Sequence, residues 1–285
     1  MVNKSSTFHK AVIGTHPKFK ETSNLPEEIS KYLQSEGIDV VLGVFESLDI
    51  EDQDLVIALG GDGTMLRAGR LCAPNDIPVL GINLGRFGFL TEMDHLEWEN
   101  ALQRLLSGDY WLEKRMMLEV ILWRGEQKLG QWDALNDAVV SRGKIVRPIH
   151  LEVHVDERFL STYVADGIIL STPTGSTAYA MAAGGPILPP ELHNILLVPL
   201  APHLSIEQAI VLADGSLVSI VAYTEHEAVL TIDGQPPINL ESDDHIEIRA
   251  SDHIVHFIRF EDPGYFYRNL TPHMNRNPSI RKKNE

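Results

Sequence analysis

The chain is organised around residues 55–66, which read Leu55-Val56-Ile57-Ala58-Leu59-Gly60-Gly61-Asp62-Gly63-Thr64-Met65-Leu66. The apolar run 55–59 has the length of a buried strand, and helix-forming residues follow the glycines through Leu71. Glycines let a ligand approach the backbone closely, and the N–H groups at a helix start favour a phosphate. The stretch therefore predicts a strand, a phosphate-binding loop and a helix beginning near Thr64. The loop consists of Gly60, Gly61, Gly63 and Thr64.

Asp62 places a negatively charged carboxylate beside the expected phosphate, a repulsive arrangement that a functional role would explain. It could hold Mg²⁺ or accept the proton of a hydroxyl that attacks a phosphoryl group. On this stretch alone an ordinary strand-to-helix turn with Asp62 as the helix cap explains the residues equally well. Two better-known loops are excluded, because no lysine follows as in a P-loop and Leu66 replaces the last glycine of the dinucleotide fingerprint.

Length and composition indicate a globular protein of two domains. The 285 residues, 44% hydrophobic and 22% charged, suffice for a full core in each domain. The formal charge of -16 disfavours nucleic acid and anionic membrane as partners, although a small basic pocket could bind a phosphorylated metabolite. Cys72 is the only cysteine, and neither a signal core in residues 1–10 nor a long apolar run is present. We expect a soluble, cytoplasmic protein.

The first part of the chain alternates strand and helix patterns, which predicts a parallel α/β sheet in an N-terminal domain, residues 1–110. Strands are expected at residues 10–15, 39–44, 55–59 and 77–83, and helices at 27–36, from 64, and at 94–107. Residues 83–90 form another loop after a strand, so this loop and the Asp62 loop are expected to face one cleft. Phe89 could stack on an aromatic ligand there or pack under the loop as a core residue.

After residue 110 the pattern changes to short β-type runs joined by turns, which predicts a β-rich domain over residues 111–274. Strands are expected at residues 118–123, 138–141, 151–155, 159–164, 168–170, 218–223, 228–232 and 245–249. The last part of this domain can pack back on the first, and residues 275–285 are expected to be a disordered polar tail.

Residues 166–185 are the second informative stretch and run from Asp166 to Gly185. They predict a strand, a hydroxyl-rich turn and a short helix of small residues, with Ser176 and Thr177 offering donors at the helix start. An ordinary capped helix is the simpler interpretation of this stretch alone. A serine nucleophile is disfavoured because Gly-x-Ser-x-Gly is absent.

The pair Asn136-Asp137 stands just before a predicted strand. An asparagine amide suits the edge of an adenine ring and a carboxylate suits ribose hydroxyls, but an Asx turn explains the pair as well. The 12 histidines form no zinc-binding pattern.

Taken together, these stretches resemble the NAD kinase family. The loop 60–64 is shared with phosphofructokinases and diacylglycerol-type lipid kinases and marks only the superfamily. The run 171–186, which reads Ser-Thr-Pro-Thr-Gly-Ser-Thr-Ala-Tyr-Ala-Met-Ala-Ala-Gly-Gly-Pro, is far more specific. The motifs follow the family's order over about residues 55–240, most of the chain.

The resemblance implies a kinase that transfers the terminal phosphate of ATP, with Mg²⁺, to the 2′-hydroxyl of the adenosine ribose of NAD, giving NADP. It implies an N-terminal Rossmann-like α/β domain and a C-terminal β-sandwich-like domain, with the active site in the cleft between them. It also implies a homodimer or homotetramer, because part of the NAD pocket comes from a neighbouring subunit in this family. Neither nucleic acid nor membrane is an expected partner.

The resemblance makes Asp62 the catalytic base, with a metal role for the same carboxylate as the secondary possibility. The family's NAD-binding positions fall on Asp62, Gly63, Arg67, Phe89, Asn136, Asp137, Arg147, Asp166, Thr177, Ala178, Tyr179, Ala180, Met181, Ala182, Ala201 and Gln235.

The chain departs from the family's pattern at three places. Asp137 replaces a frequent glutamate, Val164 replaces a frequent arginine or lysine, and Glu207-Gln208-Ala209 replaces an arginine-proline segment. Val164 weakens any argument about contacts to an extra phosphate and hence about feedback by NADP. Two other functions stay open: a lipid or sugar kinase of the same superfamily, and a non-catalytic nucleotide-binding regulator.

Overall fold

The structure, a computed structural model, describes residues 8–16, 24–85, 88–203, 205–268 and 270. The chain divides into two compact units, one formed by residues 1–113 and 255–285 and the other by residues 114–254. Within the described residues, no helix is both long enough and apolar enough to cross a lipid bilayer. The predicted polar tail, residues 275–285, lies outside the described residues.

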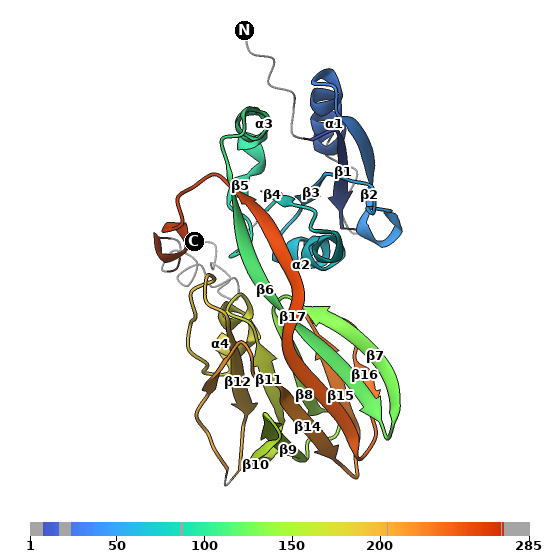
Figure 1. Ribbon diagram of the computed structural model, residues 1–285, viewed down its shortest axis with the longest axis vertical. Helices are drawn as coiled ribbons and strands as arrows, with labels where there is room; N and C mark the ends of the chain where they lie inside the picture. The colour runs from blue at the N-terminus through green and yellow to red at the C-terminus, as the bar shows by residue number, and fades with distance from the viewer. Residues whose placement is uncertain (1–7, 17–23, 86–87, 204, 269, 271–285) are drawn as a thin grey trace, which may run out of the picture. The chain divides into compact units, whose positions relative to one another are not determined.

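The first unit contains a parallel sheet in the order β2-β1-β3-β4 (Figure 1), as the alternating pattern predicts. Its elements are β1 (Lys10–Thr15), α1 (Leu25–Ser35), β2 (Asp39–Val44), η1 (Phe45–Ser47), β3 (Leu55–Leu59), α2 (Asp62–Cys72), η2 (Ala73–Asn75), β4 (Val79–Asn83), β5 (Met93–Asp94), η3 (His95–Glu97) and α3 (Trp98–Ser107). β5 pairs with the end of β4, and Phe257, near the end of β17 (Asp244–Arg259), pairs with Val79 of β4.

Helices cover both faces of this sheet, which explains why every residue of β3 is buried. Ile57 of β3 shares one apolar core with Leu33 of α1 and Leu102 of α3. α2 lies against the opposite face: a Cβ on Gly81 of β4 would meet the sulfur of Met65 at 2.5 Å. Because residue 81 has no side chain, α2 can pack closely against the sheet.

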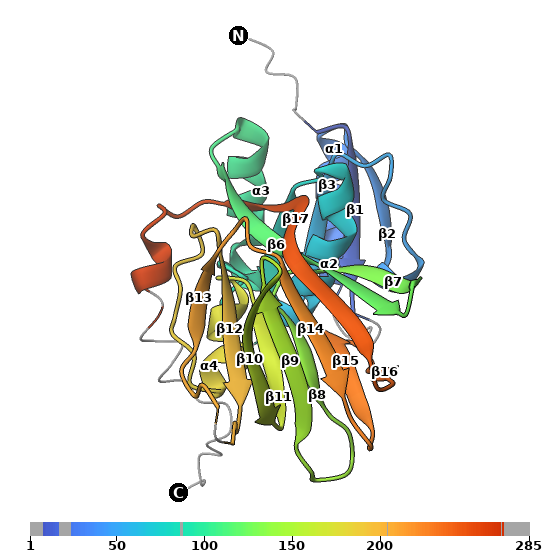
Figure 2. The same cartoon turned by 60° about the horizontal axis from the view of Figure 1, so that its bottom comes forward.

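The second unit consists of two antiparallel sheets (Figure 2). Its elements are β6 (Trp111–Arg124), β7 (Gln127–Ala134), β8 (Asp137–Arg142), β9 (Ile149–Val155), β10 (Arg158–Ala165), β11 (Gly167–Ser171), η4 (Gly175–Thr177), α4 (Tyr179–Ala182), β12 (Asn194–Leu200), β13 (Ile210–Ala213), β14 (Val218–Tyr223), β15 (Ala228–Ile232), β16 (Ile238–Leu240) and most of β17. One sheet has the order β13-β12-β11-β8-β15-β16, and the other runs β10-β9-β14-β17 with β6 beside β17 and β7 beside β6.

One apolar core joins the two sheets of this unit. Val140 and Leu170 come from the first sheet, and Leu151, Ile220 and Ile248 come from the second. These strands alternate buried and more exposed positions, as expected for sheets packed on one face. The predicted β-sandwich-like domain is therefore confirmed. A smaller cluster on the outer face of the first sheet holds Ala180 of α4 against Ile169 and Val198, and so fixes the turn before α4.

Candidate functional site

The glycine loop of the first unit joins β3 to α2, and α2 begins at Asp62 itself, two residues before the predicted start. A Cβ on Gly61 or Gly63 would meet no atom within 4 Å, so a ligand can approach the backbone there. Thr64 does not share this openness, because its buried side chain lies under Gly60, where a Cβ would come within 2.2 Å of its hydroxyl. The ligand-facing part of the loop is thus the backbone of residues 61–63.

The Asp62 carboxylate is oriented by the loop that follows β4. Its Oδ2 accepts a hydrogen bond from Phe89 N at 2.9 Å, and its Oδ1 accepts one from Leu90 N at 3.0 Å. A Cβ on Gly88 would fall 2.1 Å from Oδ1, so only glycine permits this approach. No side-chain cap starts α2. Asp62 is therefore not the cap of its own helix, and the expected proximity of the two loops is confirmed.

Two further predicted positions of the first unit lie near this loop in sequence but have different surroundings. Phe89 is half-buried, and its backbone N–H is the one that binds Asp62. Arg67 on α2 forms an ion pair with Glu46. A bound nucleotide would have to compete with Glu46 for the Arg67 guanidinium.

Asp233, which no sequence pattern singles out as a site residue, holds the loop Leu135-Asn136-Asp137 in the second unit. Its carboxylate accepts hydrogen bonds from Leu135 N at 2.9 Å, Asn136 N at 2.7 Å and Asp137 N at 3.1 Å. The Asp233 backbone has φ of 47°, the left-handed region that aspartate tolerates better than most residues. Gly234 follows it with φ of 66°. The Asp-Gly dipeptide after a strand signals the turn, but nothing local signals its partner.

The turn after β11 packs against the same loop. Thr172 Oγ1 donates to Leu135 O at 2.6 Å, and Ser171 Oγ donates to Asn136 O at 3.1 Å. A Cβ on Gly175 would come within 2.1 Å of Asn136 O, so glycine is required for this packing. The backbone of Asn136 is thus fixed from both sides.

The prediction that Ser176 offers its hydroxyl to a ligand is wrong. The side chain is fully buried, donates to Pro173 O at 2.6 Å and accepts from Leu188 N at 2.9 Å. The Thr177 hydroxyl lies 3.2 Å from Thr174 O. Small hydroxyl residues in a turn satisfy their own backbone, and a local pattern cannot separate this use from ligand binding.

The short helix α4 presents its predicted residues unequally. Tyr179 is 49% exposed, whereas Ala180 is fully buried against the sheet. Ala178 lies just before the helix and is half-buried. Met181 is half-buried, and Ala182 is exposed. A ligand at this segment would meet Tyr179 and the backbone, not the Ala180 side chain.

Asp166 and Ala201 lie at the opposite end of β11 from Asn136. Asp166 precedes Gly167, the first residue of β11, whereas Asp137 pairs with Ser171, the last. Arg142 forms an ion pair with Asp166 at 2.8 Å, and Asp166 N donates to Leu200 O beside Ala201. A five-residue strand spans about 16 Å, so one nucleoside cannot touch both ends.

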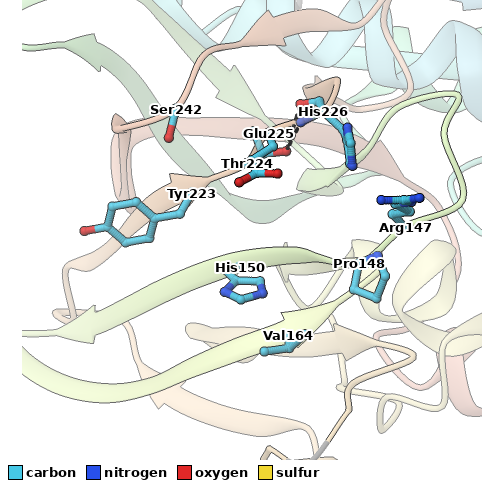
Figure 3. A pocket seen from close by; sticks show the side chains of 9 residues that line it. All are labelled: Arg147, Pro148, His150, Val164, Tyr223, Thr224, Glu225, His226 and Ser242. Atoms are coloured by element: carbon cyan, nitrogen blue, oxygen red, sulfur yellow. Dashed lines mark hydrogen bonds between the residues drawn. The ribbon is translucent and has the colours of Figure 1, made fainter.

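Arg147 and Val164 line a pocket of about 540 Å³ in the second unit (Figure 3). The other lining residues are Pro148, His150, Tyr223, Thr224, Glu225, His226 and Ser242. Val164 contributes an apolar wall to this pocket. Thr224 Oγ1 accepts from His226 N at 3.0 Å and donates to His226 O at 2.8 Å, which fixes the turn carrying His226. Gln235 is exposed in the turn after β15, near Asp233 in sequence and not among these lining residues.

The carboxyl group of Asp137 is buried beside Asp233. Burial, and then the charge of Asp233, raise the pKa of Asp137 from 3.8 to about 7. Between these values the folded protein retains a proton that the unfolded chain has lost. The free energy of unfolding therefore falls as pH rises through this window, and the penalty is complete above about pH 7.

We expect Asp137→Asn to become more stable relative to the wild type as pH rises. The relative gain in the free energy of unfolding between about pH 4 and pH 8 should be on the order of 2–4 kcal/mol, since one pKa unit corresponds to about 1.4 kcal/mol. Urea unfolding at a series of pH values measures it. Asp214→Asn, in an exposed loop, is the control. Parallel pH curves for wild type and Asp137→Asn would contradict the assignment.

The described residues contain no group of three or more histidine, cysteine, aspartate or glutamate side chains placed to hold a metal ion. A divalent ion at Asp62 would therefore need ligands from outside this set, such as phosphate oxygens and water. Mg²⁺ is often bound in that way, through one or two carboxylates and the substrate's phosphates.

Two family profiles match the chain in succession, an ATP-NAD kinase N-terminal domain over residues 7–110 and an ATP-NAD kinase C-terminal domain over residues 135–260. A NAD kinase of Chloroflexus aggregans is 39% identical, covering 92% of this chain and 96% of its own length. A NAD kinase of Heliobacterium modesticaldum is 44% identical, covering 75% and 76%.

Solved structures are similar over nearly the whole chain. Yeast NADH kinase complexed with NADH has a TM-score of 0.86 at 25% identity, covering 99% of this chain and 91% of that one. An NAD kinase from Archaeoglobus fulgidus in complex with ATP has a TM-score of 0.74 at 26% identity, covering 93% and 98%.

Proposed function

This chain belongs to the ATP-NAD kinase family, and we infer that it is an NAD kinase, which transfers the terminal phosphate of ATP to the 2′-hydroxyl of the adenosine ribose of NAD and produces NADP. The observation that carries this conclusion is the match of both family domains in order, together with relatives that cover most of the chain. Nothing in the comparisons favours a lipid or sugar kinase, or a non-catalytic regulator.

Asp62 is the proposed catalytic base. Phosphoryl transfer depends mainly on in-line positioning and charge neutralisation, and the nucleophile needs a group that orients it and takes its proton. Two backbone N–H groups hold the Asp62 carboxylate, and a carboxylate has about four lone-pair positions, so acceptor capacity for a ribose hydroxyl remains. The open backbone at Gly61 and Gly63 would take the phosphates of ATP.

We propose Mg²⁺ as the metal, carried mainly by ATP oxygens, with a metal contact of Asp62 as the secondary role of that carboxylate. Because the described residues offer no cluster of three acidic or other ligating side chains, substrate oxygens and water would complete the coordination. When bound, the ion would neutralise charge on the transferring phosphate.

Asn136 and Asp137 are proposed to hold the adenosine part of NAD, since their backbone is fixed by Asp233 and by the turn after β11. The remaining proposed NAD contacts are Gly63, Arg67, Phe89, Arg147, Asp166, Thr177, Ala178, Tyr179, Ala180, Met181, Ala182, Ala201 and Gln235. For Ala180 the contact would be through the backbone, because its side chain lies in the core.

A homodimer or homotetramer is proposed as the working form. Asp166 and Asn136 lie at opposite ends of one strand, too far apart to bind one nucleoside. A second subunit could therefore supply the predicted NAD-binding residues near Asp166 to a site formed around Asn136 of the first subunit. Light scattering coupled to size exclusion measures the state. A cytoplasmic location is also proposed, because the single cysteine, Cys72, is buried and no disulfide can form within the chain.

Incubating the purified protein with ATP, Mg²⁺ and NAD, and detecting NADP with an NADP-specific dehydrogenase, tests the proposed function. A kinase for a lipid or sugar would leave NAD unchanged, and so would a regulator that binds nucleotide without turnover. Omitting Mg²⁺ with a chelator present tests the metal requirement in the same assay.

We expect Asn136→Ala to weaken NAD binding about tenfold or more, because it removes amide groups that can pair with the adenine edge and a good pair is worth about 1.5 kcal/mol. Isothermal titration calorimetry with NAD measures the dissociation constant. Asn239→Ala, on an exposed position of β16, removes the same groups elsewhere and is the control. An unchanged dissociation constant for Asn136→Ala would count against the adenine role.

A further inference from the structure

A buried charged cluster in the first unit links the end of β17 to β6. Arg259, the last residue of β17, is 1% exposed, and its Nε donates to Glu113 Oε2 at 2.8 Å. The Tyr265 hydroxyl lies 3.1 Å from both Glu113 carboxylate oxygens. The Arg259 guanidinium carbon also lies 5.1 Å from the centre of the Phe257 ring and 5.2 Å from that of Tyr265. The guanidinium is therefore fixed by an ion pair and two aromatic rings.

The same guanidinium reaches the loop that orients Asp62. Arg259 Nη1 donates to the Leu90 carbonyl at 2.8 Å. The N–H of Leu90 donates to Asp62 Oδ1 at 3.0 Å, and the N–H of Phe89 donates to Oδ2. Only one residue, Leu90, separates the buried arginine from the carboxylate.

We propose that Arg259 is a positioning residue for phosphoryl transfer, which holds the Leu90 backbone so that its N–H and that of Phe89 fix the Asp62 carboxylate. The inference rests on the proposed role of Asp62 as the base. Within the described residues, the hydrogen bonds of Arg259 go to Glu113 and Leu90, so its effect on Asp62 passes through the loop backbone.

The energetics of the cluster favour a role beyond packing. An ion pair buried to this degree is weak in net stabilising effect, and apolar residues of similar volume often serve stability equally well. A planar guanidinium, however, can bond a carboxylate through Nε and a carbonyl through Nη1 at fixed angles. Catalytic groups must be positioned to within about half an ångström. The two hydrogen bonds of the Arg259 guanidinium hold the Leu90 backbone in place to that accuracy.

The test is Arg259→Lys, measured in the wild-type and Asp62→Asn backgrounds with the full chain. Lysine keeps the positive charge beside Glu113 but lacks the second arm that reaches Leu90 O. We expect kcat to fall between about tenfold and about a hundredfold, with a smaller change in the KM for NAD and ATP. In the Asp62→Asn background the same substitution should cause no further loss, because its effect passes through that carboxylate.

Arg104→Lys is the matched control. Arg104 also donates to a backbone carbonyl, that of Phe260 at 3.0 Å, and lies over the Phe260 ring, while its Nε donates to Asp109 and not to the Asp62 loop. Its kcat should stay within about twofold of the wild type, as expected for a substitution away from the site. If Arg259→Lys does not fold, Glu113→Gln keeps one acceptor for Arg259, and we expect a smaller loss in kcat with the same dependence on Asp62.

The outcomes separate the two proposals. A wild-type protein without NADP formation would overturn the function, and near-wild-type turnover of the Asp62→Asn variant would overturn the role of Asp62. Normal kcat in Arg259→Lys, or an equal fractional loss with and without the Asp62 carboxylate, would overturn the positioning role alone.

Discussion

The Asp62→Asn variant is expected to lose at least about a hundredfold in kcat, the low end of what a general base contributes, while NAD still binds. The amide cannot take the proton of the ribose hydroxyl at neutral pH. It also turns an NH₂ group toward one of the two N–H donors, Phe89 N or Leu90 N, and so loosens the loop. Steady-state kinetics with the coupled NADP assay gives kcat, and calorimetry gives NAD affinity.

Asp94→Asn is the control for the loss of a backbone acceptor. Asp94 Oδ1 accepts a hydrogen bond from Leu96 N at 3.0 Å in the same unit, so its substitution perturbs a similar contact away from the glycine loop. Its kcat should remain near the wild-type value. Near-wild-type turnover of Asp62→Asn would remove Asp62 from the mechanism, whatever the control shows.

The second large effect is expected from Asp233→Ala. The substitution removes the acceptor of three backbone N–H groups at residues 135–137. Each buried donor left unpaired costs about 1–3 kcal/mol, so the free energy of unfolding should fall by about 3 kcal/mol or more. Because the same loop carries Asn136 and Asp137, the KM for NAD should rise at least about tenfold, as expected for loss of roughly 1.4 kcal/mol of binding free energy.

Two variants calibrate this result. Asp243 also has a positive φ, 70°, and is exposed, so Asp243→Ala has a similar backbone cost without the loss of the three bonds. Asp233→Asn keeps one carbonyl acceptor and tolerates the left-handed backbone, and it should fall between wild type and Asp233→Ala. Equal stability and equal KM in Asp233→Ala and Asp243→Ala would show that the carboxylate does not organise the loop.

The sequence predicts the elements whose signal is local. β3 is apolar throughout and bounded by glycine, and the alternation of strands and helices before residue 110 suffices for the parallel sheet. β12 is apolar after Asn194 but contains Pro199, and β7 is polar with an internal glycine, so the sequence pattern predicts neither strand. β12 is stabilised by pairing with β11, more than twenty residues earlier in the chain, which a window of neighbouring residues does not contain. β7 forms a hairpin with the preceding strand β6, but its polar residues give no strand pattern of their own.

The candidate site likewise contains residues with a local sequence signal and residues without one. Asp62, Asn136 and Asp137 are predicted site residues because they stand where loops end or precede strands, where ligand-binding side chains are common. Asp233 and Arg259 were missed because each acts on a backbone about 97 or 169 residues away. The expectation for Ser176 fails because its hydroxyl is already used by the protein, donating to Pro173 O in its own turn and accepting from Leu188 N beyond α4.

The long strand β17 has a consequence for the order of folding. Residues 114–254 form one unbroken segment, whereas the first unit requires residues 255–268 beside residues 8–113. During synthesis Val79 at the edge of β4 has no strand partner until Phe257 is made, and Glu113 has no ion-pair partner until Arg259 is made. We therefore expect the second unit to complete its core on the ribosome before the first unit does. The residues synthesised earliest then belong to the unit that folds last.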